Sequence, residues 1–166
     1  MDAGADPRGR GLGGHALAAA LGAGLVLALV GCGGSGPAKV TPPVPGSEPA
    51  AQACTALSAK LPEVLDGHGT RTTEPQSALT AAWDDPAIVL RCGVGIPADL
   101  EPTSELYTIN DVDWLAVETG RGWLFTTVGR VANVEVAVPT NYEPAVNPLV
   151  DLATAIAAAI PAAERS

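Results

Sequence analysis

The fold is decided by the stretch Ala87-Ile88-Val89-Leu90-Arg91-Cys92-Gly93-Val94. Apolar residues alternate along it, so that one face holds Ile88, Leu90, Cys92 and Val94, and the opposite face holds Arg91. A period of two residues is typical of a strand with one buried face. The preceding residues, 83–86, read Trp-Asp-Asp-Pro and are typical of a turn. The sequence therefore predicts a half-buried strand that is entered through a turn.

Three further segments carry strand patterns, and these are Val112 to Thr119, Trp123 to Val128, and Val131 to Val138. Gly120-Arg121-Gly122 predicts a hairpin turn between the first two, and Pro139 ends the third. Residues 67–76 are polar and predict a loop, and residues 77–83 predict either a short helix or an irregular segment.

Two helices are predicted outside these strands. The first covers Ala50 to Leu61, because its apolar residues recur on one face. The second follows Asn147, the expected N-cap, with Pro148 in the first helical position, and it stops at Pro161. The order helix, strand, hairpin, strand, helix predicts an α+β fold. We expect a small antiparallel sheet of about four strands with the N-terminal and C-terminal helices packed on one face.

The N-terminal residues predict a bacterial lipoprotein signal. A short basic region is followed by an apolar run from Ala16 to Val30, too short to span a membrane comfortably. Residues 29–32, Leu-Val-Gly-Cys, resemble the lipobox of bacterial lipoproteins. This resemblance implies cleavage before Cys32 and a diacylglyceryl group on its thiol, and two acyl chains hold a protein stably on a bilayer. The alternatives are an uncleaved signal anchor or a secretory peptide that is cut elsewhere.

The pattern predicts four parts of the chain. They are a signal peptide (1–31), a lipidated Cys with a disordered Pro/Gly-rich tether (32–51), one globular domain (52–161) and a short tail (162–166). The tether would reach about 25–60 Å. The chain carries a formal net charge of −9. Nucleic acid is therefore a poor candidate partner, and the domain itself should not bind anionic lipid.

Two cysteines remain after the signal, Cys54 on the first predicted helix and Cys92 on the strand 87–94. Both fall on predicted core-facing positions outside the cytoplasm, where thiols usually pair. The sequence favours a disulfide between them. Two buried free thiols are the alternative, and metal ligation is disfavoured because neither Cys has a second ligand at the usual spacing.

No constellation in the sequence predicts catalysis, a cofactor or a metal. His68 lies between two glycines and is interpreted as a solvated loop residue rather than a catalytic base. Asn110, Asp111 and Asp113 could hold a hard cation, but a solvated turn is the commoner use of such residues. The sequence contains no Gly-x-Ser-x-Gly motif of α/β-hydrolases, no glycine-rich phosphate-binding loop and no His-Glu-x-x-His motif of zinc proteases.

Several of these segments together resemble an actinobacterial family of small secreted or membrane-anchored proteins of unknown function. The resemblance covers about Cys54 to Ile160, and its motifs are residues 83–94, 112–115 and 125–130. It implies an address in the cell envelope and supports the pairing of the two cysteines. It implies no activity and no catalytic residue.

These observations favour a non-enzymatic envelope lipoprotein, a binding or accessory module held by its lipid on the outer face of the cytoplasmic membrane. A small envelope hydrolase or cell-wall-modifying enzyme that uses acidic residues is the alternative. The protein or cell-wall partner is not specified. The candidate binding surface consists of Trp83, Asp84, Asp85, Arg91 and Arg130, which mix apolar and charged groups. The competing interpretation is that Trp83 fills the core and the charges are solvated.

Overall fold

The computed structural model of the chain describes residues 36–164. These residues form two helices and ten strands, in which short strands occupy the edges. The helices are α1 (Glu48–Ser58) and α2 (Asn147–Ala159), and the strands are β1 (Ala38–Lys39), β2 (Val64–Leu65), β3 (His68–Arg71), β4 (Thr73–Glu74), β5 (Thr80–Trp83), β6 (Ile88–Val94), β7 (Tyr107–Ile109), β8 (Val112–Thr119), β9 (Gly122–Val128) and β10 (Asn133–Pro139).

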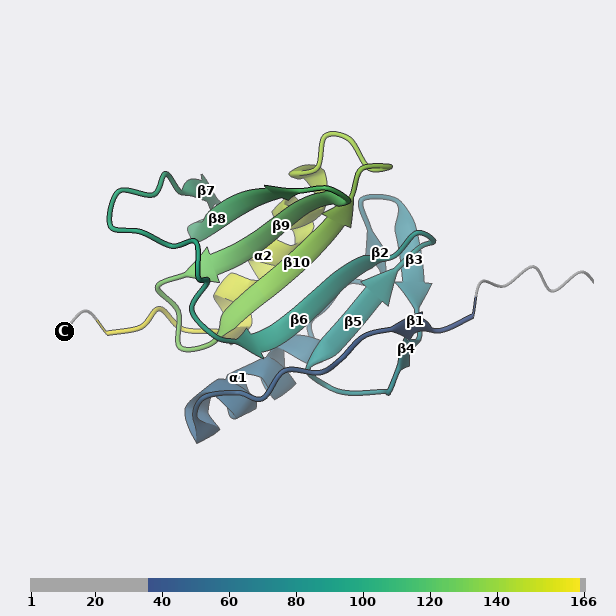
Figure 1. Cartoon of the computed structure of the whole chain (residues 1–166). Coiled ribbons are helices and arrows are strands. Elements are labelled where there is room, and N and C mark those ends of the chain that lie inside the picture. The colour runs from purple at the N-terminus through teal and green to yellow at the C-terminus, as the bar shows by residue number, and fades with distance from the viewer. Residues whose placement is uncertain (1–35, 165–166) are drawn as a thin grey trace, which may run out of the picture. The chain divides into compact units, whose positions relative to one another are not determined.

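Eight of the strands form one antiparallel sheet in the order β2-β3-β5-β6-β10-β9-β8-β7 (Figure 1). A second sheet holds only β1 and β4, which pair in parallel. The predicted α+β fold with about four strands is therefore wrong, and the described chain is mostly β. The missed strands are two to four residues long, too short for an apolar alternation to mark them.

The long strands of the sheet agree closely with the sequence patterns. The turn between β8 and β9 is tight, because Thr119 pairs with Gly122 across it. Gly122 has φ +135°, and a Cβ atom on it would lie 2.1 Å from the carbonyl oxygen of Val138. Only glycine can bring the β9 backbone this close to β10. Gly122 therefore determines how β8, β9 and β10 meet.

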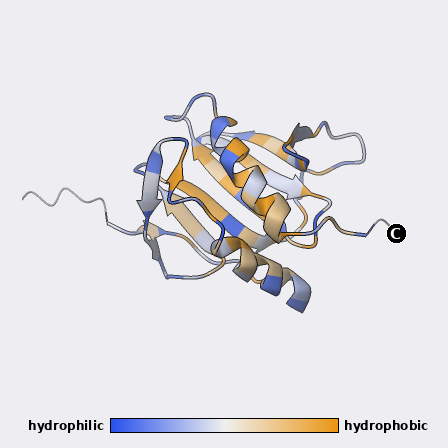
Figure 2. Ribbon diagram, turned by 180° about the vertical axis from the view of Figure 1, so that it is seen from behind, coloured by the Kyte–Doolittle hydropathy of each residue, from blue (hydrophilic) through white to orange (hydrophobic). Residues whose placement is uncertain are grey.

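Both helices cover the same face of the sheet; α2 lies behind the strands in Figure 1 and in front of them in Figure 2. The apolar face of α2 packs against the sheet, and its residues Leu149, Leu152 and Ile156 are completely buried. α1 adds Leu57 beside it, and Ser47 caps its first turn by accepting a hydrogen bond from Ala50 N. The structure assigns the N-cap of α2 to Val146 rather than to the predicted Asn147. The core therefore lies between this face of the sheet and the two helices.

A disulfide joins Cys54 of α1 to Cys92 of β6, which confirms the predicted bond. The two Cα atoms are 5.5 Å apart, within the ordinary range for a disulfide. Both cysteines are buried. The bond ties the N-terminal helix to the middle of the sheet.

Within the range of the predicted tether (32–51), the described residues contain β1 and the first residues of α1. β1 lies along β4 with hydrogen bonds from Ala38 N to Thr72 O and from Val40 N to Glu74 O. Ala38 and Val40 are buried against Ala82 on the face of the sheet opposite the helices. Because prolines stand close to Ala38 and Val40, the sequence pattern does not mark these two residues as part of a strand.

The predicted signal peptide (1–31) and Cys32 lie outside the described residues, as do residues 165–166 of the predicted tail. Within residues 36–164, neither helix combines the length and apolar character needed to cross a membrane.

Candidate functional site

Five polar residues meet at one end of the large sheet, and we call them the Asp84 cluster. They come from β3, from the turn between β5 and β6, and from the loop between β10 and α2. The register of the sheet brings these segments together, because Ala137 near the end of β10 pairs with Val89 near the start of β6. The members of the cluster are His68, Arg71, Asp84, Asp85 and Tyr142.

Asp84 is the centre of the cluster. Its backbone has φ +57°, a left-handed conformation that Asp tolerates better than most residues. One carboxylate oxygen accepts a hydrogen bond from the backbone N–H of Asp85 at 2.7 Å, and the other lies 2.5 Å from His68 Nδ1. These two contacts, the Asp85 N–H first, hold the pKa of Asp84 below its usual range. The carboxylate is therefore ionised at neutral pH and fixes the orientation of the imidazole ring.

Arg71 joins the β5–β6 turn to the beginning of the described chain. Its NH1 group donates to the Asp85 carboxylate at 2.7 Å and to the Asp84 carbonyl oxygen at 3.1 Å. Its Nε donates to the carbonyl oxygen of Gly36 at 2.8 Å. These three partners hold the guanidinium in place, and the Asp85 carboxylate balances its charge.

Tyr142 closes the cluster from the β10–α2 loop. Its hydroxyl donates to the carbonyl oxygen of Pro86 at 2.6 Å, and its ring meets that of His68 edge-on, with centroids 4.7 Å apart. Partial burial, followed by the charges of Asp84 and Asp85, raises the pKa of Tyr142. The phenol therefore stays protonated and keeps its donated hydrogen bond at neutral pH.

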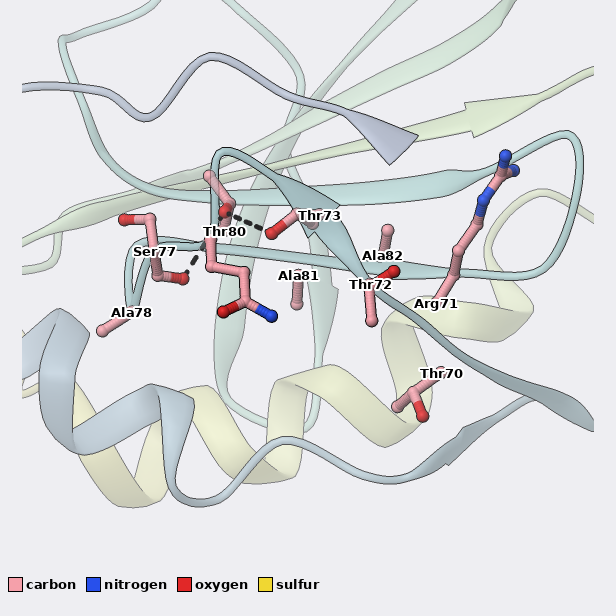
Figure 3. A pocket seen from close by; sticks show the side chains of 10 residues that line it. Thr70, Arg71, Thr72, Thr73, Ser77, Ala78, Thr80, Ala81 and Ala82 are labelled. Atoms are coloured by element: carbon pink, nitrogen blue, oxygen red, sulfur yellow. Dashed lines mark hydrogen bonds between the residues drawn. The ribbon is translucent and has the colours of Figure 1, made fainter. Parts of the chain in front are cut away.

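A hollow of about 500 Å³ adjoins the cluster along β3 and β5, and we call it the threonine hollow. Figure 3 shows Thr70 and Thr72 pointing to one side of β3, while Arg71 points to the other. Thr73 and Thr80 share a hydrogen bond of 3.3 Å at its back wall. Hydroxyl groups, one amide and small apolar side chains dominate the lining, which comprises Thr70, Arg71, Thr72, Thr73, Gln76, Ser77, Ala78, Thr80, Ala81 and Ala82.

This arrangement offers hydrogen bonds to a ligand rather than a strong charge. Threonine and serine hydroxyls and the Gln76 amide both donate and accept, which suits a neutral polar partner such as a sugar or a peptide backbone. The imidazole of His68, a residue two positions before Thr70 on β3, is 28% exposed and is oriented by Asp84. Within residues 36–164, no group of acidic, His and Cys side chains is arranged to hold a metal ion.

The five residues of the predicted binding surface do not share one surface. Trp83 is completely buried and donates from Nε1 to the Pro62 carbonyl oxygen at 3.0 Å, so it fills the core. Asp84 and Asp85 lie together at the β5–β6 turn. Arg91 pairs with Glu135 directly across from it on β10, at 2.7 Å. Arg130 lies at the opposite end of β6, where the β9–β10 turn is placed.

Arg130 has a structural use at that opposite end. Its NH1 group donates to the carbonyl oxygen of Ile160, the C-cap of α2, at 2.6 Å, and its NH2 group to that of Asp111 at 2.7 Å. The nearby residues considered for a cation are also engaged. Asn110 donates to Val150 O, and Asp113 accepts from the Thr108 hydroxyl.

His68, Arg71 and Tyr142 were not recognised from the sequence as members of a site. His68 was interpreted as a loop residue because two glycines flank it, whereas it is the first residue of β3. The signal that could have found it is the pairing of the only His after residue 15 with the acidic turn 84–85, on a neighbouring strand.

The fold and site define a class of protein, a small disulfide-closed, mostly β domain with a hydroxyl-lined hollow beside a polar cluster. The chain belongs to the family described as "Protein of unknown function (DUF3515)", whose model matches residues 16–165. This agrees with the predicted membership of a family of unknown function. Comparison with curated proteins and with solved structures found no match.

Proposed function

We propose that this chain is a cell-envelope lipoprotein that works as a non-enzymatic binding module on the outer face of the cytoplasmic membrane. The observation that carries the proposal is the buried Cys54–Cys92 disulfide. Disulfides form and persist outside the reducing cytoplasm, so the bond supports an extracytoplasmic address. The lipobox-like residues 29–32 supply the anchor, and the family match includes both the apolar run and Cys32.

The binding surface in this proposal is the threonine hollow together with His68. The hollow is open to solvent, and the hydroxyl-bearing side chains of its lining are seen in Figure 3. Such a surface can hold a polar segment of a partner through several modest hydrogen bonds. It does not exclude water from a reacting bond, which most hydrolytic sites must do. The partner is accordingly a neutral, hydrogen-bonding protein or cell-wall component.

The anchor is tested by replacing Cys32 with Ala in cells and measuring incorporation of a labelled fatty acid together with membrane fractionation. We expect the wild type to be labelled and membrane-bound, and the variant to be unlabelled and unprocessed. A Ser35→Ala variant is the matched control, because it changes a small residue beside the lipobox without removing the thiol. A wild-type chain that carries no lipid, or a Cys32→Ala chain that is still labelled, contradicts the proposal.

The binding surface is tested by site-specific crosslinking in intact cells. A photo-crosslinking phenylalanine analogue is placed at Thr72, which is exposed in the hollow, and at Glu101, an exposed control position on the loop before β7. We expect a discrete adduct from Thr72 and none from Glu101, and Thr70→Ala should weaken the Thr72 adduct. Equal adducts from both positions, or none from either, would remove the hollow as the binding surface.

The His68–Asp84 hydrogen bond favours a second candidate function, a small hydrolase of the envelope. An Asp that binds Nδ1 of a His leaves Nε2 as the available base, which is the arrangement of many general bases. Incubating the full-length protein with isolated cell wall measures this directly. Product release that disappears in a His68→Gln variant would replace the binding module with the hydrolase, and its absence supports the binding module.

A further inference from the structure

A second hollow lies on the helix-covered face of the sheet, toward its β7 edge, and the β10–α2 loop that carries Tyr142 of the Asp84 cluster also borders it. Its lining comes from β7, β8 and β9 on one side and from the β10–α2 loop on the other. We call it the aromatic pocket, and its volume is about 220 Å³. Its lining residues are Tyr107, Ala116, Trp123, Phe125, Glu143, Pro144, Ala145 and Val146.

Aromatic rings are concentrated in this pocket. The whole chain has six Trp, Tyr and Phe residues, and three of them line it. The register places Tyr107 opposite Trp114 and Trp123 opposite Val138, both buried, so these rings stand on the same face. Trp123 and Phe125 are stacked with centroids 6.1 Å apart. Tyr107 is 53% exposed, although a ring of this size is usually better covered.

The charge around the aromatic pocket has one sign. Glu143 is the only charged residue in its lining, and no Lys, Arg or His contributes to it. Glu118, which pairs with Trp123 across β8 and β9, is an exposed acidic residue on the same face of the sheet. The whole chain carries a net charge of −9, which reinforces this sign. Aromatic faces and carboxylates both attract cations, so the two features favour the same occupant.

We propose that the aromatic pocket binds a small alkylated ammonium group. A primary ammonium is strongly hydrated and needs several hydrogen-bond acceptors to replace its water, whereas this lining provides one carboxylate. An alkylated ammonium is weakly hydrated and gains from ring faces, as in the aromatic cages that hold quaternary ammonium ligands. The same chemistry occurs in a free small molecule and in a group carried by a larger partner.

The test is a titration of the full-length protein, in a non-ionic detergent, with choline as the probe. Trp83 and Trp114 are completely buried, so the indole N–H resonance of Trp123 separately reports the pocket in an NMR spectrum. The control probe is 3,3-dimethyl-1-butanol, the neutral isostere of choline. We expect a saturable shift of the Trp123 resonance and binding of choline about 3- to 30-fold tighter than binding of the isostere. Propylammonium should bind more weakly than choline.

Two variants test the roles of the ring and the carboxylate. Tyr107→Ala removes an exposed ring on an edge strand and should weaken choline binding without unfolding the protein. Glu143→Gln should weaken it about two- to fivefold, whereas the matched change Glu101→Gln, at an exposed residue outside the lining, should have no effect. Equal binding of choline and its isostere overturns the proposal, and so does a Trp123 resonance that does not move. Choline affinity unchanged by both Tyr107→Ala and Glu143→Gln also overturns it.

Discussion

Removing the Cys54–Cys92 disulfide should cost this protein a large share of its stability. The perturbation is the double variant Cys54→Ala/Cys92→Ala. The two cysteines are 38 positions apart in the sequence, and closing a loop of this size lowers the entropy of the unfolded chain. The chain-entropy relation gives a loss of about 4 kcal/mol at 25 °C. Both side chains are buried, so the missing sulfur atoms add the cost of a small cavity.

A loss of about 4–6 kcal/mol compares with about 5–15 kcal/mol for the total stability of a typical domain. Urea unfolding, followed by the fluorescence of the buried residues Trp83 and Trp114, measures the free energy of unfolding directly. The wild type that has been unfolded, reduced and refolded in reductant is the control, and it should resemble the variant. A loss below about 1 kcal/mol would refute the reasoning, because the bond would then not constrain the unfolded chain.

Three further changes should have separable effects. Gly122→Ala should destabilise the domain by at least about 3 kcal/mol in urea unfolding, because alanine rarely adopts the φ angle of Gly122 and its Cβ would clash with the Val138 carbonyl oxygen. Gly120 has open space around it, so Gly120→Ala should change stability by no more than about 0.5 kcal/mol. Arg130→Gln should cost about 1–3 kcal/mol, since it removes the donor to the carbonyl oxygens of Ile160 and Asp111, and an unchanged unfolding midpoint would contradict this role. Asp84→Asn should make stability less sensitive to acid. Because the pKa of Asp84 is lowered by folding, its contribution to stability is present above the pKa that this carboxyl has in the unfolded chain, near 3.8, and is lost as the pH falls through its pKa in the folded protein. Identical acid-unfolding curves for wild type and variant would argue against this contribution.

The long strands were predictable because each one alternates over seven or eight residues. β8 occupies the predicted range, and β6, β9 and β10 differ from their predicted ranges by one or two residues at their ends. β5 shows the limit of this approach. Its two central residues, Ala81 and Ala82, have low strand propensity, and the segment is a strand because it pairs with β6 along its whole length. Tertiary pairing of this kind leaves no local signal in the sequence.

The candidate site was predictable only at its turn. Asp84 and Asp85 stand beside a proline, so the sequence marks them as an exposed acidic turn. Their partner Arg71 is 13 and 14 positions away and comes beside them only through the pairing of β3 with β5. Tyr142 is 56 positions from Pro86, and a contact of this separation depends on strand order, which the sequence pattern does not give.

In the proposed lipoprotein, the hydrogen bond between Arg71 and Gly36 would limit how far the site can stand from the membrane. With Cys32 lipidated, as we propose, four residue steps separate the lipid from Gly36. Even a fully extended chain would cover only about 15 Å over that distance, much less than a 20-residue tether. The Asp84 cluster would therefore operate close to the headgroup layer. Its partners would be molecules confined to, or arriving at, the membrane surface, and structures deep in the cell wall would lie beyond its reach.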